Sequence, residues 1–150
     1  MANPFPFSSG DVLTAANLNS IGEYTTFTTT ATNITISSQN CLYAQVNEIV
    51  VAHYYVEFSG AASGGIGLSL PVDMTGWSDA IRAGAYPPGL ATDATGGAYT
   101  LWPCRDTSSN SNLRFFAQDY GVGFLLATAT NPFTWASGDS MRFSITYTAA

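Results

Sequence analysis

Charged side chains are scarce in this 150-residue chain: they make up 9% of it, against about 25% in an average soluble domain. There is no lysine, and four arginines stand against ten acidic residues, for a formal net charge of −6. A chain with this balance lacks the positive field that binds phosphate backbones, so we expect no nucleic-acid partner. Surface charge keeps free proteins soluble and apart from one another. A surface with so little charge is therefore typical of a protein that is largely covered by permanent partners.

Segments that direct a chain to a membrane are also missing. No apolar run approaches the ~20 residues that cross a bilayer. The opening, MANPFPFSSG, has neither a basic start nor the apolar stretch of a secretory signal. We therefore expect neither a membrane partner nor export.

Residues that carry chemistry are few. Cys41 and Cys104 match no metal or redox spacing, and we expect buried free thiols, with a disulfide between them as the alternative. The only histidine, His53, lies mid-strand, where a surface or interface role is expected. No nucleophile elbow, zinc-protease motif, P-loop or EF-hand occurs, and the chain order pairs no two carboxylates. The sequence therefore predicts no enzyme, no metal and no cofactor.

The chain is rich in uncharged polar residues and in the alternating apolar pattern of β-strands. It holds 18 threonines, 15 serines and 9 asparagines beside 46% hydrophobic residues, which is enough to form a packed core. The strongest segment predicts a strand at 41–46, a turn at Asn47–Glu48 and a long strand at 49–58. On that long strand the residues Val50, Ala52, Tyr54, Val56 and Phe58 form the predicted core face.

The opposite face of the 49–58 strand is too apolar for simple exposure to water. We therefore expect it to form a subunit interface, with the candidate residues Ile49, Val51, His53 and Tyr55.

Further strands are predicted near 23–38, 66–70, 98–104, 113–119, 122–128 and 141–148, and Asp139 is expected in the turn that opens the last one. Seven to nine strands with almost no helix predict an all-β fold, an antiparallel β-sandwich of jelly-roll kind, over residues 23–150.

Residues 1–22 differ from the rest. Two prolines and a glycine in 3–10 favour an extended arm, and 14–21 predict a short helix with Thr14 as N-cap and Gly22 after its end. A helix of about two turns is not stable alone, so its apolar side chains must dock on their own domain or on a partner. These candidate anchoring residues are Phe5, Phe7, Leu13, Leu18 and Ile21.

Three parts of the chain resemble virion surface proteins of tailed bacteriophages. The opening matches their order Phe-x-x-Gly, Leu-Thr-Ala and Leu-Asn at positions 7–10, 13–15 and 18–19. The segment YAQVNEIVVAHYYVEFSGAASGGIGLSLP is similar to their strand pair with its small-residue turn, and PFTWASGDSMRFSITYTA is similar to their closing strand. The resemblance implies a non-catalytic virion protein, usually a homotrimer, made in the bacterial host cytoplasm and carried on the outer surface of the particle.

Within that family, the short chain and the absence of a shaft favour a capsid decoration (cement) protein that forms trimeric knobs. Its partners would be its own copies and the major capsid protein or another virion protein. The alternative is a short head or tail fibre or receptor-binding tip, in which Trp77 and Tyr86 contact host glycans. An enzyme acting on carbohydrate ranks last, since no acid/base pair is evident.

Overall fold

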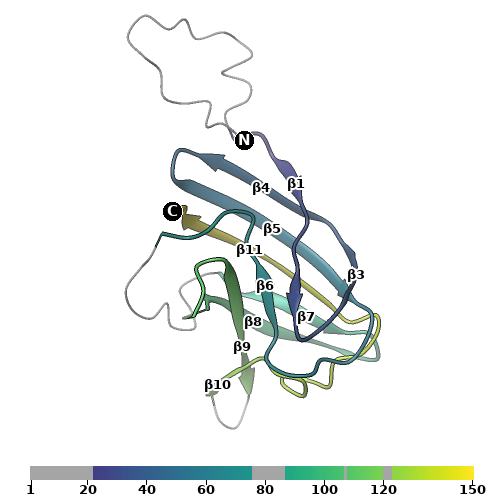
Figure 1. Ribbon diagram of the computed structural model, residues 1–150. Helices are drawn as coiled ribbons and strands as arrows, with labels where there is room; N and C mark the ends of the chain where they lie inside the picture. Colours follow the sequence, from purple (N-terminus) through teal and green to yellow (C-terminus); the bar gives the residue numbers. More distant parts are fainter. Residues whose placement is uncertain (1–21, 76–86, 107, 120–122) are drawn as a thin grey trace, which may run out of the picture.

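The structure, a computed structural model, describes residues 22–75, 87–106, 108–119 and 123–150 (Figure 1). This part of the chain contains strands and no helix. The eleven strands are β1 Thr25–Phe27, β2 Ala31–Thr32, β3 Ile36–Gln39, β4 Cys41–Val46, β5 Ile49–Phe58, β6 Gly67–Ser69, β7 Gly89–Asp93, β8 Gly97–Arg105, β9 Asn112–Asp119, β10 Gly123–Leu126 and β11 Ser140–Thr148.

All strands belong to one antiparallel sheet, in the order β1-β4-β5-β11-β7-β8-β9-β6-β2. β3 pairs with β5 beyond the end of β4, and β10 pairs with β9 beside β6. Although β1 and β2 lie at opposite edges of the sheet, they are consecutive in the chain. The sheet therefore curls into a half-barrel, and the few residues between these two strands connect its edges (Figure 1).

Thr29 holds this connection in place. It is buried, its hydroxyl donates to Ser69 O at 2.8 Å, and its backbone N–H donates to Gln39 Oε1 at 2.7 Å. The Gln39 amide in turn donates to Thr29 O at 3.2 Å. Side chains thus replace strand pairing where β3 and β6 approach each other, which satisfies the backbone groups of a linker too irregular to join the sheet.

The β4–β5 hairpin forms as its sequence predicts. Its strands have the predicted bounds, and the turn uses Asn47 in the left-handed region at φ 54°, a conformation that asparagine tolerates better than most residues. The five predicted core residues of β5 are all buried.

The core lies on the concave side of the sheet, between halves that face each other. Phe143 of β11 stacks on Tyr54 of β5 with ring centroids 4.4 Å apart, and it meets Phe115 of β9 at 5.0 Å. The fully buried Trp135 packs edge-on against Phe58 at the end of β5. The contact between Phe143 and Phe115 therefore joins two strands, β11 and β9, that are not neighbours in the sheet.

Asp139 closes the loop that leads into β11, as expected. Its carboxylate is buried and accepts hydrogen bonds from the backbone N–H of Ala94 at 2.9 Å and of Ala136 at 2.6 Å. Its own carbonyl accepts from Phe58 N–H at 2.9 Å. One side chain thus ties the loop before β11 to the β7–β8 turn.

The predicted all-β antiparallel architecture is confirmed, in the form of one continuous curled sheet. The strands predicted from the sequence do not include β7, which inserts between β11 and β8. The helix predicted at 14–21 lies outside the described residues.

Candidate interaction surface

The convex face of the β4–β5 hairpin carries the predicted interface residues. Ile49 and Tyr55 are 49% and 42% exposed, while Val51 and His53 between them are half-buried. Val46 pairs with Ile49 across the hairpin and is itself exposed. Since a strand that faced water would place polar side chains here, this apolar row, which we call the hairpin face, is a candidate contact surface.

His53 stands at the centre of a hydrogen-bonded chain on this face. Its Nδ1 lies 2.6 Å from Ser144 Oγ, and its Nε2 lies 2.9 Å from the Tyr24 hydroxyl. Ser144 is its cross-strand partner on β11, and Tyr24 precedes β1. A Ser-His-acid triad needs a carboxylate on the second imidazole nitrogen, and here that nitrogen meets a phenol. The arrangement therefore fixes the imidazole and the Tyr24 ring against the sheet.

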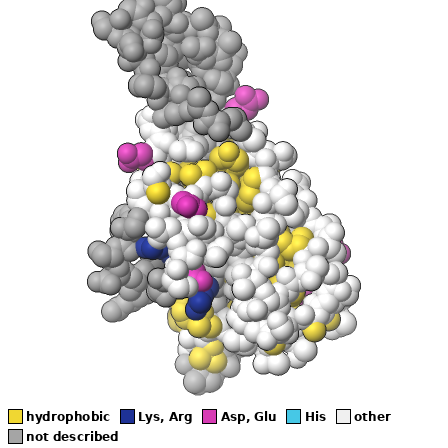
Figure 2. All heavy atoms as spheres, viewed as in Figure 1, with side chains coloured by type: hydrophobic (Ala, Val, Ile, Leu, Met, Phe, Trp, Pro, Cys, Tyr) yellow, Lys and Arg dark blue, Asp and Glu magenta, His cyan; other side chains and the backbone are white. Residues whose placement is uncertain are grey.

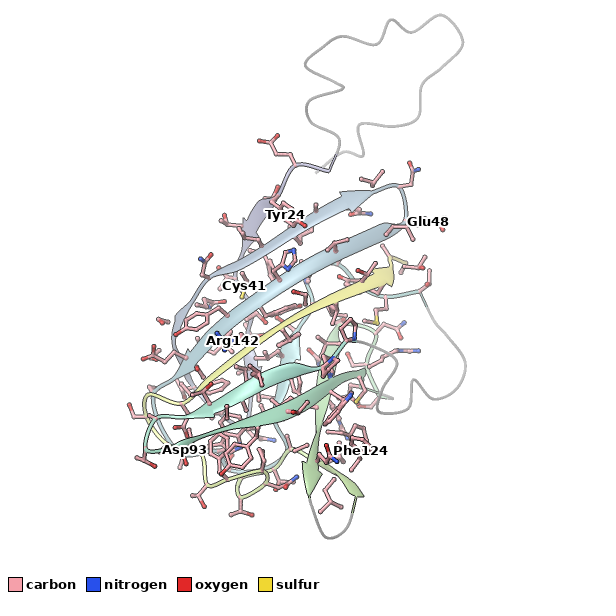
Figure 3. All side chains as sticks on the ribbon, turned by 180° about the vertical axis from the view of Figure 1, so that it is seen from behind. Tyr24, Cys41, Glu48, Asp93, Phe124 and Arg142 are labelled. Atoms are coloured by element: carbon pink, nitrogen blue, oxygen red, sulfur yellow. The ribbon has the colours of Figure 1, made fainter. Side chains whose placement is uncertain are left out.

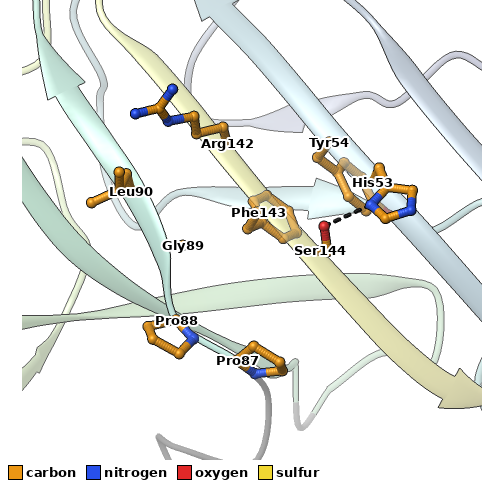
Figure 4. A pocket seen from close by; sticks show the side chains of 9 residues that line it. All are labelled: His53, Tyr54, Pro87, Pro88, Gly89, Leu90, Arg142, Phe143 and Ser144. Carbon is orange, nitrogen blue, oxygen red and sulfur yellow. Dashed lines mark hydrogen bonds between the residues drawn. The ribbon is translucent and has the colours of Figure 1, made fainter.

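A groove of about 430 Å³ opens beside this network (Figure 4). It arises because β7 pairs with β11 only as far as Arg142, opposite Leu90. Pro87 and Pro88 precede β7 and have no N–H with which to extend the pairing. The groove is lined by His53, Tyr54, Pro87, Pro88, Gly89, Leu90, Arg142, Phe143 and Ser144.

Close packing at Gly89 allows β7 to lie against β11 at the edge of the groove. A methyl group at this position would lie 2.4 Å from Phe143 Cβ and 2.6 Å from Arg142 O, so only glycine fits without displacing the backbone. The buried ring of Tyr54 forms part of the lining, and its hydroxyl donates to Ser69 O at 3.1 Å. Burial, with smaller contributions from Tyr147 and Cys41, raises the pKa of Tyr54, so this phenol stays protonated.

The groove carries one cation on its rim. Arg142 is exposed and forms no ion pair with any residue that the structure describes. Arg114, by contrast, pairs with Asp106 at 3.0 Å. Apolar walls with an arginine at one end and hydroxyl and imidazole groups at the other suit a small anionic ligand with an apolar face.

The cysteines are free and buried, as expected. Burial raises the pKa of Cys41, and it raises that of Cys104 to about 11 against the opposing influence of Arg114. Both thiols are therefore protonated at neutral pH, a state of low reactivity.

Two further carboxylates, Asp93 and Asp106, accept hydrogen bonds from residues two positions further along the chain. Hydrogen bonds from the Thr95 side chain and backbone lower the pKa of Asp93. Partial burial raises the pKa of Asp106, but bonds from Ser108 together with Arg114 outweigh it, and the net shift is downward. Within the described ranges, no group of three His, Cys, Asp or Glu side chains is placed to hold a metal ion.

Several predicted site residues lie outside the described part of the chain: the anchoring residues Phe5, Phe7, Leu13, Leu18 and Ile21, and the candidate glycan contacts Trp77 and Tyr86. The hairpin-face residues are brought together as neighbours on one strand. The hydrogen bond between His53 and Ser144 was not predicted. The sequence could have indicated it only if the 49–58 strand had been paired with the last strand, since the alternating residues of the two strands then place His53 opposite Ser144.

Sequence reasoning also missed the exposure of a strand at the other end of the molecule. Side chains Phe124, Leu125 and Leu126 of β10 are 49%, 41% and 40% exposed. Phe124 packs edge-on against Trp102, whose ring is half-buried on the convex face. The segment was predicted as a strand, but its position beside β6 at the margin of the sheet has no local sequence signal.

Comparisons with protein-family models, with curated proteins and with solved structures find no match to this chain. In the part of the chain that is described, no helix has the length and hydropathy to cross a bilayer.

Proposed function

We propose that the protein is a non-enzymatic structural component of a phage virion, a capsid decoration protein that forms trimeric knobs and clamps the shell. The observation that carries the proposal is the hairpin face. It is an exposed apolar row on a well-packed sheet, in a chain rich in neutral polar residues. The face of the molecule in Figure 2 shows few charged side chains among neutral polar side chains and backbone. Closed symmetry would bury this row in self-contact without leaving an open end.

In this proposal the N-terminal arm, residues 1–21, makes the second contact with another virion subunit. Its attachment point is Gly22, where an added methyl group would meet Val46 Cγ2 at 3.7 Å, so the arm leaves the domain beside the hairpin face. The anchoring residues of 1–21 would then seat on a sister subunit or on the capsid. In the same proposal, the facing halves of the curled sheet correspond to the layers of the jelly-roll sandwich that the sequence predicts.

A receptor-binding tip is the second candidate function, and the groove beside Arg142 favours it. Its volume suits one or two sugar rings, and Arg142 on its rim would select a saccharide that carries a carboxylate. In this alternative Trp77 and Tyr86 remain candidate glycan contacts.

Heat resistance of whole particles separates the two functions. A clamp acts through contact area, about 25 cal/mol for each Å² of apolar surface buried before the cost of association is subtracted. Particles that lack the protein should therefore release their genome at a lower temperature than complete ones, and a several-fold rise in salt should not strip the protein, because weakly charged contacts are little screened. Particle-release assays across a temperature series measure both.

Bare particles that resist heat equally well but do not adsorb to host cells would refute the clamp. The receptor-binding tip would then take its place, and Arg142→Ala would be the first variant to test for lost adsorption.

A further inference from the structure

β10 is an edge strand without the usual protection. It pairs with β9 on one side only, and none of its residues is charged or proline. Ala127 N–H donates to Phe115 O of β9, so by alternation the backbone groups of Phe124 and Leu126 point away from β9. The amide of Asn131 bonds Leu126 O at 2.9 Å, which leaves Phe124 N–H, Phe124 C=O and Leu126 N–H with no partner among the described residues. Such an edge is a template for another strand.

An aromatic platform lies beside this edge. Phe124 and Leu126 share the convex face with Phe116 and Trp102, which follow in register on β9 and β8. The rings of Trp102 and Phe124 meet at 4.7 Å. Hydrophobic side chains are visible at this end of the molecule in Figure 2. An added strand would therefore gain side-chain contacts as well as backbone hydrogen bonds.

One segment of this chain has the sequence that such an edge requires. Residues 3–7 read Asn-Pro-Phe-Pro-Phe, with prolines at every second position and phenylalanines between them. In an extended segment Asn3, Phe5 and Phe7 direct their backbone groups to one side, and Pro4 and Pro6 face the other. One edge can then pair with β10, both phenylalanine rings project from one face, and the prolines prevent any further strand from adding.

We propose that residues 3–7 of a second copy of the chain add to the free edge of β10, with Phe5 and Phe7 over the Trp102–Phe124 platform. This deepens the proposed function by naming a partner for the arm, and it rests on that function only for the premise that the chain self-associates.

The distance from the arm's attachment point to β10 favours an arm from a second copy of the chain over the arm of the same domain. Tyr24, near the arm's attachment point, and Phe124 lie at opposite ends of the molecule (Figure 3). Residues 8–21, with the predicted short helix, reach at most about 34 Å from Gly22, so only a nearly straight arm could bring residues 3–7 to β10 of its own domain.

Hydrogen exchange in the full-length chain tests this placement. The amides of β10 should exchange at least about tenfold more slowly in the parent than in F5S/F7S. They should also lose that protection on dilution, because the strand comes from another molecule. S8A/S9A, which changes the same arm without touching the phenylalanines, should retain the parent's protection. Mass spectrometry of a peptide that covers 123–127 provides the readout.

Equal exchange in the parent and in F5S/F7S would overturn the proposal, and so would protection that survives dilution, which would assign the edge to the chain's own arm. Light scattering on the same samples keeps the claims separate. Trimers without protected β10 amides refute the arm placement alone. Protected amides in a protein that leaves particles unclamped refute the proposed function alone.

Discussion

Replacing Asp139 by alanine should lower the free energy of unfolding by about 3 kcal/mol. The buried carboxylate accepts two backbone hydrogen bonds, from Ala94 and Ala136, and bonds to a charged acceptor contribute about 1.5–3 kcal/mol each. Truncation leaves both N–H groups without their acceptor and detaches the β7–β8 turn from the loop that leads into β11. Urea denaturation followed by circular dichroism measures the change.

Two further variants test the cause. Asp139→Asn keeps the shape but turns an amide donor toward one of the two N–H groups, so it should be destabilised by an intermediate amount. Asp73→Ala removes an exposed carboxylate for which no side-chain bond is seen in the described residues, and should stay within about 0.5 kcal/mol of the parent. An Asp139→Ala protein as stable as Asp73→Ala would show that the buried bonds do not hold the loop.

The β4–β5 hairpin was predictable from the sequence because its determinants are local. Alternation of apolar residues sets the buried face of β5, and Asn47–Glu48 marks the turn. The curling of the sheet was not predictable in this way. It depends on Thr29, Gln39 and Ser69 meeting from three separate segments, and none of these residues carries a local signal of its partner.

In the candidate site, too, some features follow from the local sequence and others depend on pairing between distant segments. The apolar convex face of β5 follows from period-two alternation, and the structure places its residues together. The groove depends on where β7 leaves β11, and the free edge of β10 depends on strand order, and both are set by pairings between distant segments. Trp102 shows the consequence: an aromatic residue in a strand is expected in the core, but its strand register directs it to the convex face.

If the protein forms the proposed trimer through the hairpin face, introducing a charge at Ile49 should convert that trimer to monomers. Ile49→Asp places a carboxylate in the hairpin face, where self-contact would bury it without a partner and bring like charges together around the symmetry axis. We expect the dissociation constant to rise by at least about 100-fold, which corresponds to roughly 2.8 kcal/mol. Because Ile49 is half exposed at the start of β5, the fold itself should persist. Multi-angle light scattering with circular dichroism measures both.

Ala98→Asp is the matched control. Ala98 is exposed on β8, away from the hairpin face, and a carboxylate there should leave the trimer intact. If the two variants have the same mass as the parent, the hairpin face is not the self-contact.

The most direct test of the account is an electron-microscopy map of the assembled phage particle to which the proposed function assigns this chain. The account predicts threefold clusters of curled-sheet domains on the outer surface of the shell, each with its hairpin face against a sister subunit. A particle without the protein, or with copies only at the tip of the tail, would contradict it.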